Sequence, residues 1–373
     1  MKGIIIAGGP GTRLRPLTYT RPKPLIPVVN RPFLEYQVAL LKRHGIDEII
    51  FATNYMADKI QNHFGDGTRF GVSMKYAIEE HPLGTAGAIK NAQNVAGGKE
   101  TLVVLNGDVL TDFDLSAIVQ FHREKNALVT LALKEVPSPS PYGVIITDET
   151  GRVKEFREPS EAQKKALAAN PHPQPTGEVD YINAGIYIMQ PEALNAIPSG
   201  RPVSVERETY PKFLAEGAPI YAVSQNGYWL DIGRAEQYRQ ATEAILSRKI
   251  SVEVPGKWQA AGYWAEDGAE VDPTAHLAPT VHIGHRARIG AGTSITGKTV
   301  IGPHCVIGTD VTLKDCILED GVVVGNGSTL SGVILDDGVK VEKDCIVTVN
   351  AVFASGSLIA KGTRITSENL SSE

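Results

Sequence analysis

A glycine-rich stretch with two nearby cations lies close to the N terminus. Gly8, Gly9 and Gly11 directly follow an apolar run, and Arg13 and Lys23 come shortly after them. Because glycine has no Cβ, its backbone N–H groups can approach an anion closely, and successive N–H groups form an anion-binding concavity. With the charges of the arginine and the lysine added, the predicted chemistry is the binding of a polyphosphate.

This loop differs from the standard phosphate-binding motifs. A P-loop has Lys and then Ser or Thr after its second glycine, whereas this chain has Thr12 and Arg13. A dinucleotide-binding fingerprint needs a helix directly after the glycines, and the prolines at 16, 22, 24 and 27 exclude one here. The glycines alone are equally typical of a turn after the first strand of any α/β domain, so the specificity lies in the longer run.

The longer run resembles the signature of the nucleotidyltransferases that make nucleotide sugars. GGPGTRLRPLT at residues 8–18 and KPLIP at residues 23–27 match every fixed position of that signature. The resemblance implies that a sugar 1-phosphate oxygen attacks the α-phosphorus of a nucleoside triphosphate and releases pyrophosphate. It is greatest to the mannose-1-phosphate guanylyltransferases, which implies GTP and mannose 1-phosphate as substrates. Adenylyl, uridylyl and thymidylyl transfer to glucose 1-phosphate are the alternatives.

Both substrates of such a reaction are anions, so the site needs cations. A unit-charge contact at about 4 Å is worth roughly 4 kcal/mol at an effective dielectric constant of about 20. Phosphoryl-type transfer is catalysed mostly by positioning and charge stabilisation, and no protein nucleophile is required. The resemblance implies that Arg13 holds the departing pyrophosphate and that Lys23 contacts the phosphates. A solvated loop lysine is the alternative for Lys23, although the flanking prolines stiffen its loop.

Two aspartates could supply a metal site. Asp108 follows an apolar strand-like run, and Asp231 lies in the segment GYWLDIG at 227–233. Mg²⁺ takes one or two carboxylates together with substrate phosphates. Either aspartate could instead cap a turn or a helix. The resemblance implies that both are metal ligands and catalytic, with Mg²⁺ as the cofactor.

The resemblance also assigns a turn that recognises the base, at Pro82–Gly87. A plain turn ahead of a helix is the alternative. Glu79 and Glu80, just before it, could accept hydrogen bonds from a guanine N1–H and amino group. The nucleotide-binding residues implied in this way are Ala7, Gly8, Gly9, Gly11, Thr12, Gly84 and Thr85.

On the sugar side the resemblance implies contacts from Gly143, Glu158 and Asn183. The chain departs from the family pattern at the residue after Glu158. The family has a lysine there that binds the sugar phosphate, whereas this chain has Pro159. This departure leaves the choice of sugar open. The cations that could replace the missing lysine are Lys154, Arg157, Lys164, Lys165 and Arg207.

Alternating strand-like and helix-like patterns extend over residues 1–247. They predict an α/β fold, a mostly parallel sheet with helices on both faces, which the resemblance makes Rossmann-like. Ligands of such sheets bind beyond the carboxyl ends of the strands, where both the glycine loop and Asp108 are expected. The predicted strands are 3–7, 48–53, 101–105 and 127–134, and the predicted helices are 33–44, 114–125 and 233–249.

A different pattern begins after a linker predicted at residues 248–268. Aliphatic residues recur every six positions, with two slips of one residue, which predicts a left-handed parallel β-helix over 269–373. The slips predict loops or irregular coils. A β-sandwich with frequent glycine turns is the alternative. The predicted inward residues are Leu277, Ile283, Ile289, Ile295, Ile301, Ile307, Leu313, Leu318, Val324, Leu330, Leu335, Val341, Val347, Phe353, Ile359 and Ile365.

Composition excludes several other classes of function. The 373 residues carry a formal net charge of −5 without a basic stripe, so no nucleic-acid partner is expected. No apolar run reaches the roughly 18 residues that span a membrane, and the start of the chain does not resemble a signal peptide. We therefore expect a cytoplasmic protein. The cysteines, at 305, 316 and 345, lack metal-ligand spacing and are expected to be buried and reduced.

Two further classes of function compete with the enzyme assigned above. A catalytically inactive regulatory subunit that binds nucleotide sugars would be expected to lack some of the four residues Arg13, Lys23, Asp108 and Asp231, and all are present. An acyltransferase that uses a β-helix histidine as its base would draw on His282, His285 or His304. For the β-helix, a part in assembling a homo-oligomer, from dimer to hexamer, is the preferred prediction.

Overall fold

The computed structural model describes residues 1–140, 142–157 and 177–367. The chain forms two compact units that divide the molecule differently from the limits predicted along the chain. The first unit contains Met1–Gly9 and Leu34–Asp231. The second unit contains Pro10–Phe33 and the chain from Ile232 onward. The segment with Gly11, Arg13 and Lys23 therefore belongs to the same unit as the β-helix.

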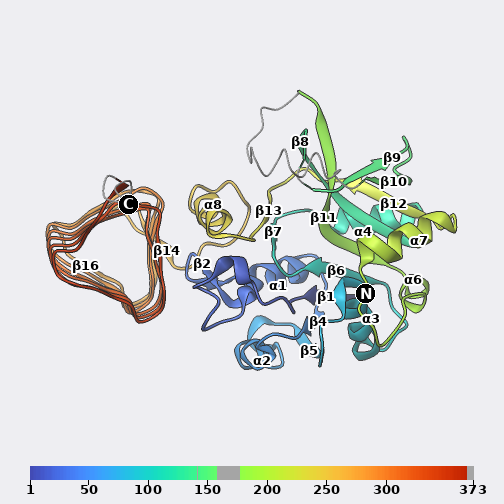
Figure 1. Cartoon of the computed structure of the whole chain (residues 1–373), viewed down its shortest axis with the longest axis horizontal. Coiled ribbons are helices and arrows are strands. Elements are labelled where there is room, and N and C mark those ends of the chain that lie inside the picture. Colours follow the sequence, from blue (N-terminus) through green and yellow to red (C-terminus); the bar gives the residue numbers. More distant parts are fainter. Residues whose placement is uncertain (141, 158–176, 368–373) are drawn as a thin grey trace. The chain divides into compact units, whose positions relative to one another are not determined.

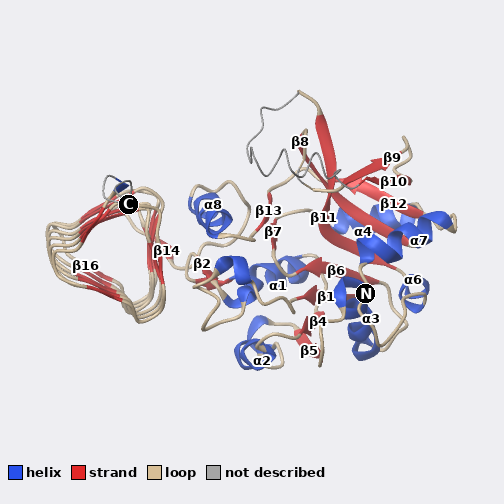
Figure 2. Ribbon diagram, viewed as in Figure 1, coloured by secondary structure: helices blue, strands red, loops and turns tan. Residues whose placement is uncertain are grey.

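The first unit is built on a sheet whose centre is parallel, which confirms the predicted α/β fold (Figures 1 and 2). Its parallel strands lie in the order β6, β1, β4, β5. The isoleucines, valines and leucines of β1, β4 and β6 are buried except for the half-buried Ile6, as expected for strands covered on both faces, whereas burial alternates along the edge strand β5. The bounds are β1 Lys2–Ile6, β4 Glu48–Thr53, β5 Ser73–Ile78 and β6 Leu102–Asn106.

Helices cover both faces of this parallel region. Ile4 of β1 shares a buried cluster with the alanines of α3. On the other face, Gly3 leaves room for Leu41 of α1, since a Cβ at Gly3 would lie 2.9 Å from Leu41 Cδ1. The helices of this unit are α1 Phe33–Arg43, which begins at the unit boundary, α2 Ala57–Phe64, α3 Gly84–Ala96, α4 Leu115–Glu124, α6 Pro191–Asn195 and α7 Tyr210–Ala215, with the π-helical turn η4 Val205–Thr209.

The sheet continues beyond β6 through an antiparallel strand. β11 pairs antiparallel with β6 and with β8, and β12 adds to β8 in parallel. β9 pairs with β11, and β10 pairs with β9. A small separate sheet joins β7 to β13. The bounds are β7 Val109–Thr111, β8 Val129–Pro137, β9 Val144–Thr147, β10 Val153–Arg157, β11 Val179–Met189, β12 Ile220–Ser224 and β13 Trp229–Asp231.

In the second unit, the segment 10–33 consists of two short 3-10 turns and a hairpin. The turns are η1 Thr12–Leu14 and η2 Lys23–Leu25, and the hairpin joins β2 Pro27–Val28 to β3 Arg31–Pro32. Val29 and Asn30 at its tip both have positive φ, which is typical of a two-residue hairpin loop. The helix α8 Ala235–Leu246 belongs to this unit.

The β-helix has three sheets of short parallel strands, which appear edge-on as the sides of a triangle in Figures 1 and 2. The first, called here the covered sheet, contains β15 Trp264–Ala265, β18 Val281–Ile283, β21 Thr299–Ile301, β24 Ile317–Leu318, β27 Ile334–Leu335 and β30 Val352–Phe353, with β14 Lys257–Trp258 antiparallel at its edge. The second contains β16 Glu270–Val271, β19 Arg288–Ile289, β22 Val306–Ile307, β25 Val323–Val324, β28 Lys340–Val341 and β31 Leu358–Ile359. The third contains β17 His276–Leu277, β20 Ser294–Thr296, β23 Thr312–Lys314, β26 Thr329–Ser331, β29 Ile346–Val347 and β32 Arg364–Ile365.

The predicted inward residues form the core of this β-helix. All of them lie in its buried cluster or pack against it. The two slips in the repeat are irregular coils, the second of the two predicted forms, and not loops. Leu313 still pairs with Leu330 and Leu318 with Leu335 on either side of each slip, so the coils stay in register and one corner is a residue shorter. The three cysteines are free and buried, as predicted.

Among the described residues, no helix combines the length and the apolar character that a membrane span requires.

Candidate active site

The predicted nucleotide loop leaves the sheet at the carboxyl end of β1. Ala7 is buried, and its N–H still donates to a carbonyl of β4 (2.8 Å). A Cβ at Gly8 would lie 3.4 Å from Asn54 Cβ, whereas Gly9 faces open space. Asn54 and Glu79 directly follow β4 and β5, and the Asn54 amide donates to the Glu79 carbonyl (2.7 Å). The backbone of Gly8 and Gly9 is thus presented at the sheet edge where ligands of parallel sheets bind.

The two predicted metal ligands come from neighbouring strands of the first unit. Asp108 directly precedes β7, and Asp231 ends β13 opposite Val109. A gap of more than a hundred residues in the sequence is therefore closed by one antiparallel pair. No group of three or more His, Cys, Asp or Glu side chains among the described residues forms a metal cluster. Two carboxylates suit Mg²⁺, which completes its shell with water and substrate phosphates.

The turn that carries Asp108 is held in place by a residue that was not predicted from the sequence. The side chain of Gln37, on α1, is 2 % exposed and donates to two carbonyls, those of Asn106 and Val109, each at 2.8 Å. These carbonyls bracket Asp108. The turn also passes very close to β1, since a Cβ at Gly107 would lie 2.3 Å from the Ile6 carbonyl oxygen. A buried glutamine on an amphipathic helix gives no local signal of this role.

The predicted base-recognition turn is clamped at both ends. Gly84 has φ +68°, and a Cβ there would lie 2.6 Å from the Val203 carbonyl oxygen. The Glu79 carboxylate, 7 % exposed, accepts a hydrogen bond from the Leu83 N–H (2.9 Å). Burial raises the pKa of Glu79. One oxygen of Glu79 therefore holds the turn, while Glu80 is exposed.

Two of the predicted sugar residues, Gly143 and Asn183, lie at the same edge of the sheet. Asn183 starts an irregularity in β11, and its side-chain Oδ1 accepts a hydrogen bond from the Gly185 N–H (3.0 Å). Gly185 packs against Asn106, since a Cβ there would lie 2.7 Å from Asn106 Nδ2. Gly143 directly precedes β9, whose first residue pairs with the neighbour of Asn183. Asn183 thus lies beside the end of β6, and β6 ends two residues before Asp108.

Glu206 connects the turn predicted to recognise the base with Asn183, which is predicted to bind the sugar. Its carboxylate accepts hydrogen bonds from the hydroxyls of Thr85 (3.4 Å), Ser204 (3.1 Å) and Tyr187 (3.3 Å). Tyr187 in turn accepts from the Asn183 amide (2.9 Å). Burial and the Glu206 charge raise the pKa of Tyr187. No local sequence pattern indicates Glu206, because its partners come from three separate segments.

Two candidates for the missing lysine are already paired on the surface. Arg157 makes a two-pronged contact with Glu155 (3.0 and 2.9 Å). Lys154 contacts Asp148 (2.8 Å) and holds the pKa of that carboxyl well below its usual range. Arg207 is exposed on η4. Outside the described residues lie Glu158, Lys164 and Lys165.

In the second unit, the cationic part of the signature folds around Gly11. Thr12 begins η1, and the Gly11 carbonyl accepts from the Leu14 N–H (3.0 Å). A Cβ at Gly11 would lie 2.8 Å from Lys23 Cβ, so only glycine allows this approach. The Arg13 guanidinium lies beside Gly233, where a Cβ would be 3.1 Å from Nη2. Gly11, Thr12, Arg13 and Lys23 therefore form one local cluster.

The β-helix histidines have structural partners. His282 is fully buried, and its ring nitrogens contact the Pro255 carbonyl (2.9 Å) and the Asn30 amide (3.2 Å). Burial lowers its pKa to about 4. His304 contacts Asp320 (2.9 Å), and its ring lies edge-on to that of His285. A buried His282 with both nitrogens engaged is not placed to act as a general base.

Relatives of known kind cover most of the chain. It is 40 % identical over 269 residues to a UTP–glucose-1-phosphate uridylyltransferase of Synechocystis and 40 % identical over 246 residues to a mannose-1-phosphate guanylyltransferase of Mycobacterium tuberculosis. These matches cover 69 % and 65 % of the chain and 66 % and 64 % of the relatives, so the chain spans about two thirds of their length. Mannose-1-phosphate guanylyltransferase 1 of Arabidopsis thaliana is 33 % identical over 327 residues, 86 % of the chain and 79 % of the relative.

Solved structures and family profiles indicate the same kind of protein as these relatives. HddC from Yersinia pseudotuberculosis, solved in complex with GMP-PN, is 27 % identical with a TM-score of 0.53, covering 65 % of this chain and 99 % of that one. The profile named EIF2B subunit epsilon LbH domain matches residues 261–365. The profile named Nucleotidyl transferase matches residues 2–248, so the chain belongs to the nucleotidyl transferase family.

Proposed function

We propose that this protein transfers a nucleotidyl group from a nucleoside triphosphate to a sugar 1-phosphate and releases pyrophosphate. The observation that carries the proposal is the pairing of Asp231 with Val109, which brings a second carboxylate beside Asp108. In the same unit, the glycine backbone, the Gly84 turn and Asn183 gather at the carboxyl edge of the sheet. These groups suit phosphates, a base and sugar hydroxyls.

In the proposed reaction, the sugar phosphate oxygen forms a bond to the α-phosphorus while the bond between the α-phosphorus and the bridging oxygen breaks. Asp108 and Asp231 would hold Mg²⁺, which when bound neutralises phosphate charge. Arg13 and Lys23 stabilise the charge that grows on the departing pyrophosphate. Asn183 orients the sugar. The side chains bind and position, and none of them forms a covalent intermediate.

GTP and mannose 1-phosphate are the preferred substrates in this proposal. Several relatives are named as mannose-1-phosphate guanylyltransferases, including the one from Arabidopsis whose match extends into the β-helix. UTP with glucose 1-phosphate is the second candidate, because the Synechocystis relative is equally similar. Pyrophosphate release should be measured for four triphosphates crossed with mannose, glucose, galactose and glucosamine 1-phosphates. Faster turnover of any glucose 1-phosphate pair than of GTP with mannose 1-phosphate would overturn the preferred assignment.

Asp108→Asn tests the metal assignment. We expect Mg²⁺-dependent turnover to fall by about a hundredfold or more, because one of two carboxylates is lost where phosphate charge is greatest. Asp114→Asn is the matched control, since Asp114 caps α4 by accepting from the Ala117 N–H (3.1 Å) and asparagine caps equally well. An Asp108→Asn enzyme that keeps its turnover would exclude this carboxylate as a metal ligand.

A further inference from the structure

The covered sheet of the β-helix has buried residues, most of them apolar, on its outer side as well as in the core. His282, Val300, Ile317 and Ile334 alternate with core residues along its strands, and each is at most 3 % exposed. At matching positions of the second sheet, Val323 is 36 % exposed. The outer side of the covered sheet is therefore buried beneath other parts of the second unit.

The segment 10–33 and α8 make hydrogen bonds to this side of the β-helix. Asn30, at the hairpin tip, donates to the Ile301 carbonyl (3.0 Å). Arg239 of α8 donates to the Gly332 carbonyl (2.5 Å) and the Asp315 carbonyl (3.5 Å), the two corners that are one residue short. Both shortened corners thus lie where a side chain of α8 donates to the β-helix backbone.

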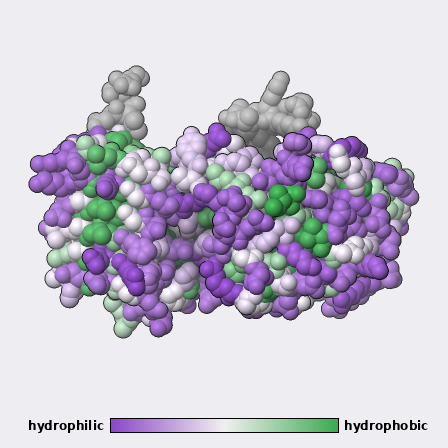
Figure 3. Space-filling model, turned by 90° about the horizontal axis from the view of Figure 1, so that it is seen from below, coloured by the Kyte–Doolittle hydropathy of each residue, from purple (hydrophilic) through white to green (hydrophobic). Residues whose placement is uncertain are grey.

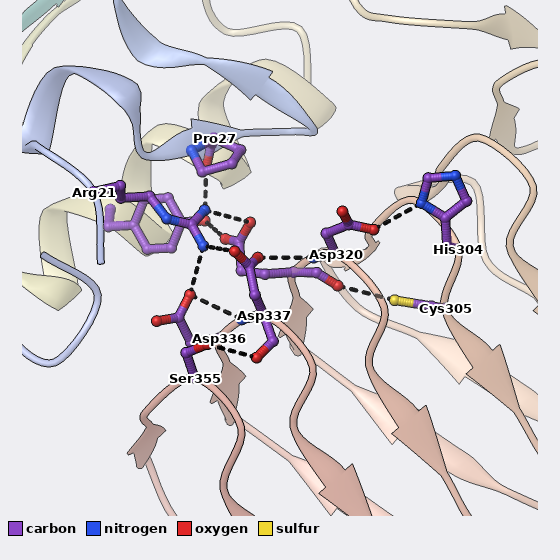
Figure 4. Close-up of polar contacts among 10 residues, drawn as sticks. Arg21, Pro27, His304, Cys305, Asp320, Asp336, Asp337 and Ser355 are labelled. Atoms are coloured by element: carbon purple, nitrogen blue, oxygen red, sulfur yellow. Dashed lines mark hydrogen bonds and ion pairs between the residues drawn. The ribbon is translucent and has the colours of Figure 1, made fainter. Parts of the chain in front are cut away.

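Arg21 enters a cluster of three β-helix carboxylates (Figure 4). It contacts Asp336 (2.9 Å), Asp337 and Glu319 (3.8 Å). The Asp336 and Glu319 side chains are 1 % and 5 % exposed, and the Arg21 side chain is 14 % exposed. Burying carboxylates is costly unless a cation compensates them. Arg21 supplies that charge from a loop hundreds of residues away in sequence.

A second anchor lies a few residues further along the same loop. The Tyr238 hydroxyl lies 2.7 Å from the Pro27 carbonyl oxygen and 2.5 Å from Glu319 Oε1. A hydroxyl has one proton and can donate to only one of these acceptors. The arrangement is satisfied when Glu319 is protonated and donates to Tyr238, which donates to Pro27. Lys23 lies between the two anchored positions, Arg21 and Pro27.

We propose that Arg21 is a positioning residue that holds the loop around Lys23 in place through the carboxylates of Glu319, Asp336 and Asp337. Lys23 packs against Gly11, so the anchor also sets the start of the phosphate-binding loop. The β-helix is then part of the apparatus that binds the triphosphate. This inference rests on the proposed function only in assuming that Lys23 contacts the phosphates of the triphosphate.

Arg21→Ala, Arg21→Lys and Asp337→Asn test the proposal in the full-length protein. Hydrogen–deuterium exchange reports the order of residues 10–27, calorimetry reports the affinity for GTP, and steady-state rates with the best substrate pair separate KM from kcat. We expect Arg21→Ala to speed exchange in the loop and to weaken triphosphate binding about tenfold or more, because small misplacements of a binding group are costly. Arg21→Lys should recover part of the affinity, and Asp337→Asn should show a smaller change.

Arg288→Ala is the matched control, an arginine on the second sheet that contacts only the exposed Glu270 (3.5 Å) among the described residues. It should leave loop exchange and affinity unchanged. If the Arg21→Ala variant does not fold, loop exchange and GTP affinity in the Arg21→Lys and Asp337→Asn variants test the proposal. Wild-type loop exchange and wild-type affinity in the folded variants would overturn the proposal. If the wild type transfers no nucleotide, the proposed function fails, while loop exchange and GTP affinity still decide the role of Arg21.

Discussion

Among single residues, Gln37 decides where Asp108 lies. Its amide bridges the carbonyls on either side of the turn, so Gln37→Leu removes two hydrogen bonds from buried groups. We expect a loss of about 1–3 kcal/mol of stability and a higher Mg²⁺ concentration for half-maximal turnover. Denaturant unfolding and a Mg²⁺ titration measure the two effects. Gln120→Leu, on the exposed side of α4, is the control, and an unchanged Mg²⁺ requirement in Gln37→Leu would contradict this role.

Glu319 makes the stability of the protein depend on pH. Burial raises its pKa from 4.5 to about 7, while the nearby charges of Arg21, Asp336 and Asp337 and the Tyr238 hydroxyl also face it. A raised folded-state pKa means that the native state holds a proton that the unfolded chain releases. Its contribution to stability is therefore complete below pH 4.5 and is lost as the pH rises through about 7.

Glu319→Gln keeps a donor for Tyr238 and cannot ionise. Between pH 5 and pH 8 we expect the wild type to lose about 2–3 kcal/mol of stability relative to this variant. Denaturant unfolding of both proteins at the two pH values measures the difference. Other groups that titrate in this range, such as the buried His122, are the same in both proteins. Their contributions therefore cancel in the stability difference between the wild type and Glu319→Gln. A constant difference between the two proteins would show that Glu319 does not titrate in this range.

The helix α3 depends on a glycine at each end, for different reasons. Gly84 at its start has φ +68° and contacts the Val203 backbone, whereas Gly97 after its end has φ +93° and open space around it. Alanine at either position is strained by the positive φ, at roughly 1–2 kcal/mol, but only Gly84→Ala also pushes against Val203. We expect Gly84→Ala to raise the KM for the triphosphate and Gly97→Ala to leave it unchanged. Steady-state kinetics of the two variants measure the KM values, and thermal unfolding measures their stabilities. Equal KM values would show that the turn at Gly84 does not take part in nucleotide binding.

At the scale of the whole molecule, assembly through the β-helix stays a prediction. The surface in Figure 3 is mostly hydrophilic, with hydrophobic residues gathered in a stripe along the β-helix at the left. On the second sheet, Val306 and Val323 are register neighbours and are 40 % and 36 % exposed. A flat apolar surface suits a second copy of the chain.

We expect the double change Val306→Lys, Val323→Lys to reduce the mass measured by light scattering after size exclusion. Each partner in such a contact would have to bury two added charges. Thr312→Lys with Thr329→Lys, a neighbouring pair on the third sheet, is the control. A wild type that is monomeric at micromolar concentration, or a valine variant of unchanged mass, would show that this sheet is not an interface.

Much of the architecture could be predicted because it depends on short-range patterns. The helix predicted at 33–44 is observed at Phe33–Arg43, and the strand predicted at 48–53 is observed at Glu48–Thr53. The six-residue period identified the core residues of the β-helix, since each coil repeats the same local geometry. The slips were visible in the sequence, but the hydrogen bonds that Arg239 donates to those two corners were not, because Arg239 lies on a helix far away in the sequence.

By itself, the sequence predicted the reaction class through the signature at residues 8–27, and it determined the two kinds of fold through their periodicities. Only the tertiary structure set Asp231 beside Asp108, placed Gln37 under that turn, joined Thr85 to Asn183 through Glu206, and gave Arg21 its carboxylates. A periodic pattern records which face of an element is buried. Which distant element covers that face follows from packing and charge compensation over the whole chain, and no local window of residues contains that information.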